Sequence, residues 1–380
     1  MKYASITDYA HTELRSFEAK PFSPVDSLIL SQLAYNEILP IYSSPDCPSP
    51  LKIADTYRAE YFDTMFTSFM VVEASERLLS AAAASPRFRD LEISHYLSEN
   101  DPNEEKQFSA TCYRLREGLH YIAFRGTDDS LVGWKEDFSI AFKSPVPSQR
   151  RAAEYLSALA EDIDGELILG GHSKGGNLAV YAAMAVSQEV QARISAVFNH
   201  DGPGFKAGVL DNDGYRRIEE KIQKTLPQSS LVGMLLDGHN SYKVVGSRRI
   251  GIMQHDPFSW EIDGDDFHTV EEVSDGAQYV NTALTSWLDG MTDAERERFV
   301  EILFGILDAG KAETITEINR EWRKNFAAIF SAYKDADPEF KTFVRQLLKD
   351  FGSILAQNLK AKVLHHKHES GGSPSLPEKA

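Results

Sequence analysis

The sequence predicts an α/β protein in which a mostly parallel central sheet has helices on both of its faces. Two observations carry this prediction. Short β-rich runs alternate with helical stretches through the middle of the chain, and this alternation is typical of parallel sheets. One of the predicted strands also turns into a helix through the glycine-rich segment Gly171 to Gly176, which has a serine near its centre.

The composition is ordinary for a soluble globular protein. Of the 380 residues, 42% are hydrophobic and 26% are charged, so the chain can bury a sizeable core. The formal net charge of −17 opposes binding to nucleic acid and to anionic lipid surfaces. We find no transmembrane run, no secretory signal and no C-x-x-C pair of cysteines. These features predict a cytoplasmic protein that has no nucleic-acid partner.

The first half of the chain predicts a helix and a β-hairpin. Residues 25–35 follow Pro24 and carry apolar residues at helical spacing, which predicts the helix. Gln107 to Leu115 and Leu119 to Phe124 are β-rich runs separated by an Arg-Glu-Gly turn, so we expect them to pair as a hairpin. The second strand of this hairpin ends at Arg125-Gly126-Thr127.

The middle of the chain predicts the parallel part of the sheet. Arg150 to Ala160 has an apolar helical face, and Leu167 to Leu169 is a short apolar strand. Asn177 to Val186 is rich in Ala, Leu and Met and predicts a helix directly after the glycine-rich turn. Ile194 to Phe198 and Tyr242 to Val245 are two further predicted strands.

Beyond about residue 290 the strand signals stop and helical patterns replace them. Thr292 and Glu295 have the spacing of a capping box, an apolar stripe follows them, and a second stripe begins at Phe340. Apolar stripes need a surface to cover them, so we expect these helices to pack on the rest of the protein. The predicted parts are a sheet domain over residues 1–290, a C-terminal helical extension over residues 291–363 and a disordered tail over residues 364–380.

The central functional signal is Gly171-His172-Ser173-Lys174-Gly175, a G-x-S-x-G sequence. In this pattern small flanking residues allow a strained strand-to-helix turn, which pushes the serine hydroxyl out of the sheet. The predicted strand before the turn and the predicted helix after it supply that context. Ser173 is therefore the predicted nucleophile, and the alternative is a glycine-rich turn with an incidental serine.

A second signal lies where the predicted hairpin ends, at Phe124-Arg125-Gly126-Thr127, and Trp134 and Asp137 follow it. A strand end with a glycine-containing turn can present a backbone N–H toward a nucleophile. The start of the helix after Ser173 offers further N–H groups. We therefore expect the backbone N–H groups of Thr127 and Lys174 to form an oxyanion hole.

Together the two motifs resemble the class 3 lipase branch of the α/β hydrolases, in which F-R-G-T and W-x-x-D precede a G-H-S-x-G-G turn. Three more segments look like a bacterial lipase-like family of unknown function, and they are Val25 to Leu30, Asp201 to Phe205 and Gln254 to Trp260. The resemblance covers roughly residues 20 to 265. It implies an α/β-hydrolase fold and a serine hydrolase mechanism, and it implies no particular substrate.

A serine hydrolase also needs a base, and in this fold the histidine comes last in the chain order. His255 lies 82 residues after Ser173, beyond the last predicted strand, in a turn-like Gln-His-Asp-Pro segment. His255 is the predicted base, and His268 is the alternative. His172 is expected to pack near the turn rather than to act as the base.

Two aspartates are candidates for the acid that orients the histidine. The class 3 lipase resemblance implies a D-x-V-P sequence near Ser229 to Gly233, but that stretch contains no aspartate. Asp201 directly follows the strand Ile194 to Phe198 and lies before a Gly-Pro-Gly turn, so it is the predicted acid. Asp237 is the alternative.

These residues predict an esterase or lipase-like serine hydrolase that cleaves an acyl ester or thioester of a small or lipid-like molecule. Ser173 would attack, His255 would move the proton and an aspartate would orient the imidazole, with no cofactor and no metal. An amidase or peptidase could use the same residues. A catalytically silent scaffold that binds a ligand or partner is the alternative outside the enzymes. The sequence leaves the oligomeric state open.

Overall fold

The computed structural model describes residues 3–298 and Thr342, apart from residues 67–70, 102, 104–105, 128–135, 137–138, 141–142, 231, 237–240, 275–277, 279–281, 283–284 and 286–289. Trp134, Asp137 and Asp237 therefore lie outside the described residues. Nearly all of the expected helical extension and the whole of the expected tail also lie outside the described residues. The division of the chain at residues 290 and 363 stays a prediction.

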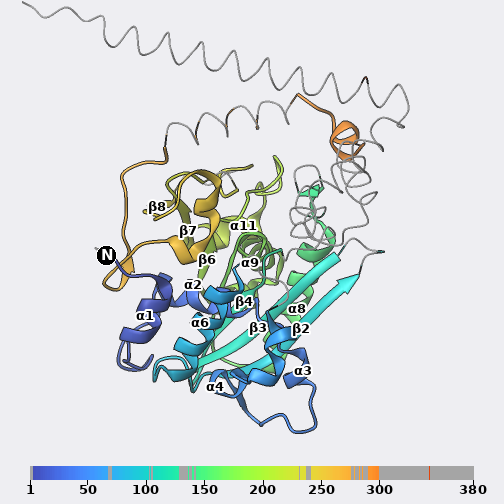
Figure 1. Ribbon diagram of the computed structural model, residues 1–380. Coiled ribbons are helices and arrows are strands. Elements are labelled where there is room, and N and C mark those ends of the chain that lie inside the picture. Colours follow the sequence, from blue (N-terminus) through green and yellow to red (C-terminus); the bar gives the residue numbers. More distant parts are fainter. Residues whose placement is uncertain are drawn as a thin grey trace, which may run out of the picture.

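An eight-stranded sheet forms the centre of the described structure, with its strands in sequence order (Figure 1). Strands β1 to β4 pair antiparallel, and strands β4 to β8 pair parallel. The predicted hairpin is formed by β3 and β4, and the other predicted strands are β5, β6 and β8. The bounds are β1 Leu51–Lys52, β2 Glu92–Asp101, β3 Lys106–Arg116, β4 Leu119–Phe124, β5 Glu166–His172, β6 Ile194–His200, β7 Ile222–Pro227 and β8 Lys243–Val245.

The predicted helices are α2, α8, α9 and the start of the helix at residues 293–298, and the other helices whose bounds follow were not predicted. The bounds are α1 Ile6–Thr12, α2 Pro24–Leu33, α3 Leu39–Tyr42, α4 Ile53–Thr56, α5 Phe62–Met65, α6 Val72–Ala84, α8 Pro147–Asp162, α9 Lys174–Ala185, α10 Gln188–Arg193 and α11 Asp213–Ile218. Short 3₁₀ turns lie at Ala59–Tyr61, Glu219–Lys221, Gly251–His255 and Pro257–Ser259, and a small separate sheet pairs β9 (Ile262–Asp263) with β10 (Asp266–Phe267).

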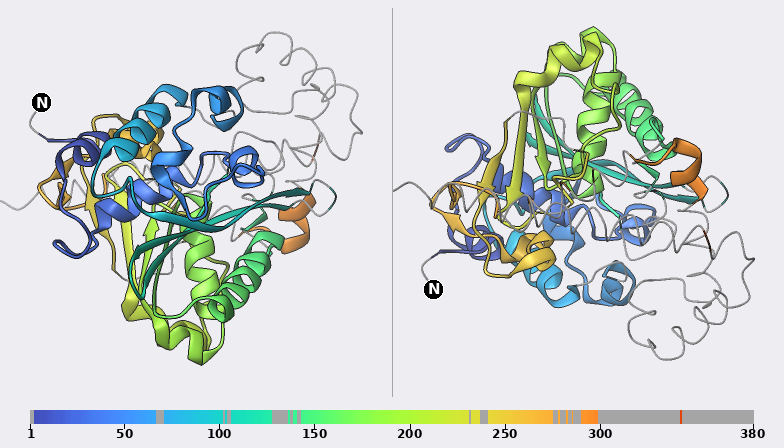
Figure 2. Two further views of the ribbon diagram at one scale, coloured as in Figure 1. Left: turned by 90° about the horizontal axis from the view of Figure 1, so that it is seen from below. Right: turned by 90° about the horizontal axis from the view of Figure 1, so that it is seen from above.

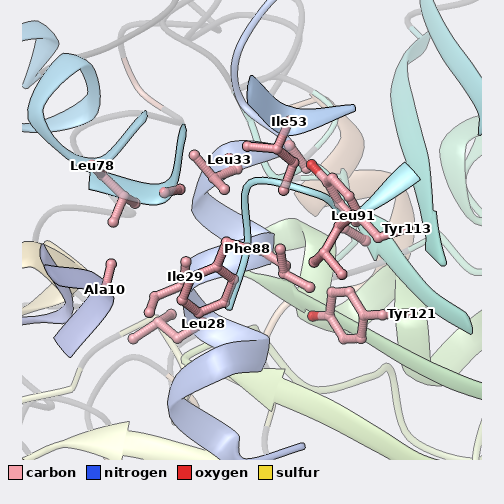
Figure 3. Close-up of a cluster of buried hydrophobic side chains, with 14 of the residues drawn as sticks. Ala10, Leu28, Ile29, Leu33, Ile53, Leu78, Phe88, Leu91, Tyr113 and Tyr121 are labelled. Carbon is pink, nitrogen blue, oxygen red and sulfur yellow. The ribbon is translucent and has the colours of Figure 1, made fainter. Parts of the chain in front are cut away.

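The two faces of the sheet are covered by helices from different parts of the chain (Figure 2). On one face α1, α2 and α6 pack against Tyr121 of β4 (Figure 3). Ile168 of β5 belongs to the same buried cluster. On the other face α8, α9 and α11 pack against Ile122 and Leu169. Neighbouring residues of a strand point to opposite faces, which is why consecutive residues of β4 and β5 join different clusters.

Chain direction explains this division of the helices. Strands β4 to β8 advance in one direction across the sheet, so right-handed crossovers place all of their connecting helices on the same face. The opposite face is left for the N-terminal helices. A buried ion pair fixes them, since Arg87, after α6, donates two hydrogen bonds of 2.7 Å to Asp26 in the first turn of α2.

The architecture is the predicted α/β-hydrolase fold, with a mostly parallel sheet, helices on both faces and the serine turn between β5 and α9. Within the part of the chain that the structure describes, no helix has the length and apolar character to cross a membrane. The predicted capping box is present, because the Thr292 N–H donates to the Glu295 carboxylate at 2.8 Å and the Glu295 N–H donates to the Thr292 hydroxyl at 3.3 Å.

Candidate active site

Ser173 lies at the turn between β5 and α9 in a strained backbone conformation. Its φ of 58° and ψ of −134° fall in a region that residues with side chains rarely adopt. Two backbone hydrogen bonds hold the turn: the Ser173 N–H donates to the His200 carbonyl at 3.0 Å, and the Gly176 N–H donates to the Ser173 carbonyl at 2.9 Å. This is the sharp turn that the G-x-S-x-G pattern predicts.

The flanking glycines allow β4, β5 and α9 to approach closely. A Cβ atom on Gly171 would lie 2.3 Å from the carbonyl carbon of Gly175. A Cβ atom on Gly175 would lie 2.1 Å from the carbonyl oxygen of Phe124. Both atoms would meet backbone, which cannot move aside cheaply, so only glycine fits at these two positions.

Ser173, His255 and Asp201 form a hydrogen-bonded chain. The Nε2 atom of His255 lies 3.0 Å from the Ser173 Oγ, and its Nδ1 atom lies 2.6 Å from the Asp201 Oδ2. The Asp201 side chain is fully buried, whereas 28% of the His255 side chain is exposed. The structure therefore brings together the three residues predicted as nucleophile, base and acid. The alternative base, His268, instead stacks on the Tyr3 ring at 3.9 Å.

Asp201 directly follows β6, as the sequence predicts, and has a left-handed φ of 53°. Its N–H donates to the Thr225 carbonyl of β7 at 2.8 Å. One carboxylate oxygen faces His255, and the other accepts hydrogen bonds from the Ser230 hydroxyl at 2.5 Å and the Gly233 N–H at 3.1 Å. Both oxygens are therefore paired, which makes the burial of this carboxylate tolerable.

His255 lies in a loop that is held by hydrogen bonds between its own residues. The Ser247 and Ser259 hydroxyls lie 2.8 Å apart across the base of this loop. Within it, the side chain of Gln254 accepts a hydrogen bond of 2.6 Å from the Ser229 N–H and donates one of 2.9 Å to the Arg249 carbonyl. These contacts fix the loop beside the turn that follows β7.

Two buried histidines lie behind the site. Burial lowers the pKa of His172 well below its ordinary value and lowers the pKa of His200 to about 3, so both rings are neutral near pH 7. The Nε2 atom of His172 lies 2.9 Å from the His255 carbonyl oxygen, and this nitrogen is therefore the donor. His172 supports the loop of His255, as a packing residue near the turn would.

We expect acid to destabilise the protein through these two histidines. They stay neutral in the folded state but take up a proton in the unfolded state below its pKa of about 6.5. The unfolded state then binds more protons, so the free energy of unfolding falls as the pH drops from about 6.5 toward 3. Urea unfolding at several pH values measures this slope. His200→Gln should flatten it, and an unchanged slope in this variant would contradict the assignment.

Thr127 and Lys174 lie at the same edge of the sheet as Ser173. Thr127 follows β4, which pairs with β5, and Lys174 is the first residue of α9. The N–H groups in the first turn of a helix point toward its N-terminal end, so the N–H of Lys174 faces the side on which Ser173 stands. Residues 128–135 lie outside the described residues, and the oxyanion hole stays a prediction.

The side chain of Lys174 has a role that the sequence did not indicate. Its Nζ atom lies 3.1 Å from both the Gln107 carbonyl oxygen and the Glu136 carboxylate, and the lysine and glutamate side chains are almost completely buried. Glu136 also accepts a hydrogen bond of 2.8 Å from the Ser148 N–H. This ion pair ties the serine turn to the start of α8. A G-x-S-x-G pattern leaves this position unspecified, so no sequence signal could have found the pair.

Three of the solved structures to which this chain is similar are lipases. A fungal lipase in complex with an inhibitor is 16% identical, with a TM-score of 0.36 over 58% of this chain and 76% of that chain. M37 lipase is 14% identical, with a TM-score of 0.33 over 54% of this chain and 67% of that chain. Lip2 lipase from Yarrowia lipolytica is 15% identical, with a TM-score of 0.29 over 46% of this chain and 71% of that chain. No curated protein matches the sequence.

A family model described as Mbeg1-like matches residues 82–305. This match includes Ser173, Asp201 and His255, and it extends beyond residue 290, where the sequence predicted a boundary. Because it covers more than half of the sequence, the chain belongs to the Mbeg1-like family.

Proposed function

We propose that this protein is a serine hydrolase of the esterase or lipase type, which cleaves an acyl ester or thioester. The observation that carries the proposal is the unbroken hydrogen-bond chain from the Ser173 hydroxyl through the His255 imidazole to the buried Asp201 carboxylate. The three residues follow three different strands, and the serine is held in a strained turn. Strain of this kind persists only where the surrounding structure enforces it, and it concentrates at active sites.

In the proposed reaction, His255 takes the proton of Ser173 while the serine oxygen attacks the acyl carbonyl carbon. Asp201 keeps the Nδ1–H of the imidazole directed toward itself and stabilises the imidazolium that forms. The backbone N–H groups of Thr127 and Lys174 would bind the oxyanion. His255 then donates its proton to the leaving alcohol or thiol, and water releases the acyl group from Ser173 by the same steps.

The position of Asp201 bears on the choice between an enzyme and a silent scaffold. The stretch Ser229 to Gly233 contains no aspartate, which by itself favours a scaffold that only binds. Asp201 is hydrogen-bonded to the imidazole from a different strand end, and this arrangement supports an enzyme. The triad does not choose the leaving group, so an amidase or peptidase is the competing activity.

The test is covalent labelling combined with a substrate series. Wild-type protein is incubated with a fluorophosphonate probe, and peptide mass spectrometry locates the label. The same protein is assayed with p-nitrophenyl acetate and butyrate, with a thioester and with the matching p-nitroanilides. We expect the label on Ser173 and faster turnover of esters than of anilides. Absence of both label and turnover would contradict the proposal, and faster anilide turnover would make the protein an amidase.

A further inference from the structure

The turn after β7 reaches both the acid and the histidine loop of the site. β6 and β7 are adjacent parallel strands, so Asp201 and the residues after Pro227 lie at the same edge of the sheet. Ser230, which is 2% exposed, contacts Asp201, and its neighbour Ser229 contacts Gln254 beside His255. We infer that Ser230 is a positioning residue, which orients the carboxylate of Asp201 for catalysis. This inference rests on the proposed function.

The hydrogen-bond pattern defines which way the Ser230 proton points. The single Gly233 N–H is shared between the Ser230 Oγ and the Asp201 Oδ1, each at 3.1 Å, so it occupies one lone pair of the serine oxygen. An ionised carboxylate can only accept, and the Asp201 Oδ1 lies 2.5 Å from the same Oγ. The serine hydroxyl is therefore the donor to Asp201.

Asp201 needs this partner because the torsion that turns a carboxylate group is soft. The histidine binds only Oδ2, and rotation of the group would break that hydrogen bond. The Ser230 hydroxyl and the Gly233 N–H both bind Oδ1, and together they fix the plane of the carboxylate. A Cβ atom on Gly233 would lie 2.3 Å from Oδ1, so only glycine lets this N–H approach.

Ser229 provides a matched control in the same turn. Its backbone N–H donates to Gln254, which holds the histidine loop, whereas its hydroxyl lies 3.2 Å from the Ser274 hydroxyl. Replacing Ser229 by alanine removes that hydroxyl and leaves the backbone contact in place. The two adjacent serines therefore separate a loss of contact with Asp201 from a general change in the turn.

The experiment compares Ser230→Ala, Ser230→Cys and Ser229→Ala with the wild-type protein. We expect kcat for p-nitrophenyl acetate to fall about 10- to 100-fold in Ser230→Ala, as for loss of a hydrogen bond to a charged group, while KM stays within about twofold. Cysteine keeps the shape but is a weak donor, so Ser230→Cys should lie between alanine and wild type. Ser229→Ala should match wild type.

Proton NMR supplies a readout that does not depend on turnover. The proton between His255 and Asp201 should give a low-field resonance in wild type and in Ser229→Ala, and Ser230→Ala should weaken or shift it. Ser230→Ala with wild-type kcat and resonance would overturn the inference and leave the proposed function intact. Wild-type protein without turnover or label would overturn the function, and the resonance of the two variants would then decide the role of Ser230.

Discussion

Replacing Ser173 by alanine is expected to abolish fluorophosphonate labelling and to lower ester turnover by a factor of about 10⁶, the loss seen when a serine hydrolase loses its nucleophile. No other group on the hydrogen-bonded chain can form the acyl intermediate. The effect is measured as kcat with p-nitrophenyl butyrate. Any residual rate would come from substrate binding and oxyanion stabilisation alone.

Ser157→Ala is the matched control. This serine is exposed on α8, and its hydroxyl donates a hydrogen bond to the Ala153 carbonyl of the same helix. It should keep the wild-type rate and the wild-type labelling. Labelling that persists unchanged in Ser173→Ala would mean that the probe reacts with another residue. That result would contradict the proposed mechanism.

Replacing Asp201 by asparagine is expected to lower kcat by up to about 10⁴ and leave the protein folded. Asparagine has the same shape and tolerates the left-handed φ of 53° found here. Its side-chain amide, however, would donate toward His255 and favour the wrong imidazole tautomer. Steady-state kinetics and thermal unfolding of the same samples separate a catalytic loss from a folding defect.

Asp237→Asn tests the alternative acid, which lies outside the described residues. This variant should retain the wild-type rate. The reverse result, with near-full activity in Asp201→Asn and loss in Asp237→Asn, would move the acid to Asp237 and would leave the hydrogen bond of 2.6 Å between Asp201 and His255 without a catalytic role.

The serine turn could be predicted because its causes are local in sequence. Gly171 and Gly175 are required by backbone contacts within one strand–turn–helix unit and with the neighbouring β4, so the pattern carries the geometry. Asp201 and His255 could be predicted from chain order and from their positions after predicted strands. This evidence is less direct than the sequence motif around Ser173. Parallel strands align their ends, and this brought both residues to the same edge as Ser173.

Other elements had no local signal. β2 is rich in polar and charged residues, and its pairing depends on the neighbouring strands β1 and β3. β7 is a short strand with two charged or amide side chains. The contacts of Ser230 with Asp201 and of Lys174 with Glu136 join residues that lie 29 and 38 positions apart. Both contacts form only when distant segments pack together, and no local sequence pattern at these residues indicates them.

The arrangement of helices around the sheet has a practical consequence for how this chain can be divided. The family match begins at residue 82, near the end of α6, so it includes the triad and the parallel strands but omits α1, α2 and most of α6. Those omitted helices contribute much of the buried apolar cluster on one sheet face. A fragment cut to the bounds of the family match would expose that apolar face to water and invite self-association. The family match is thus smaller than the sheet together with the helices that pack on it, and we expect a recombinant fragment to fold only if it begins before α1.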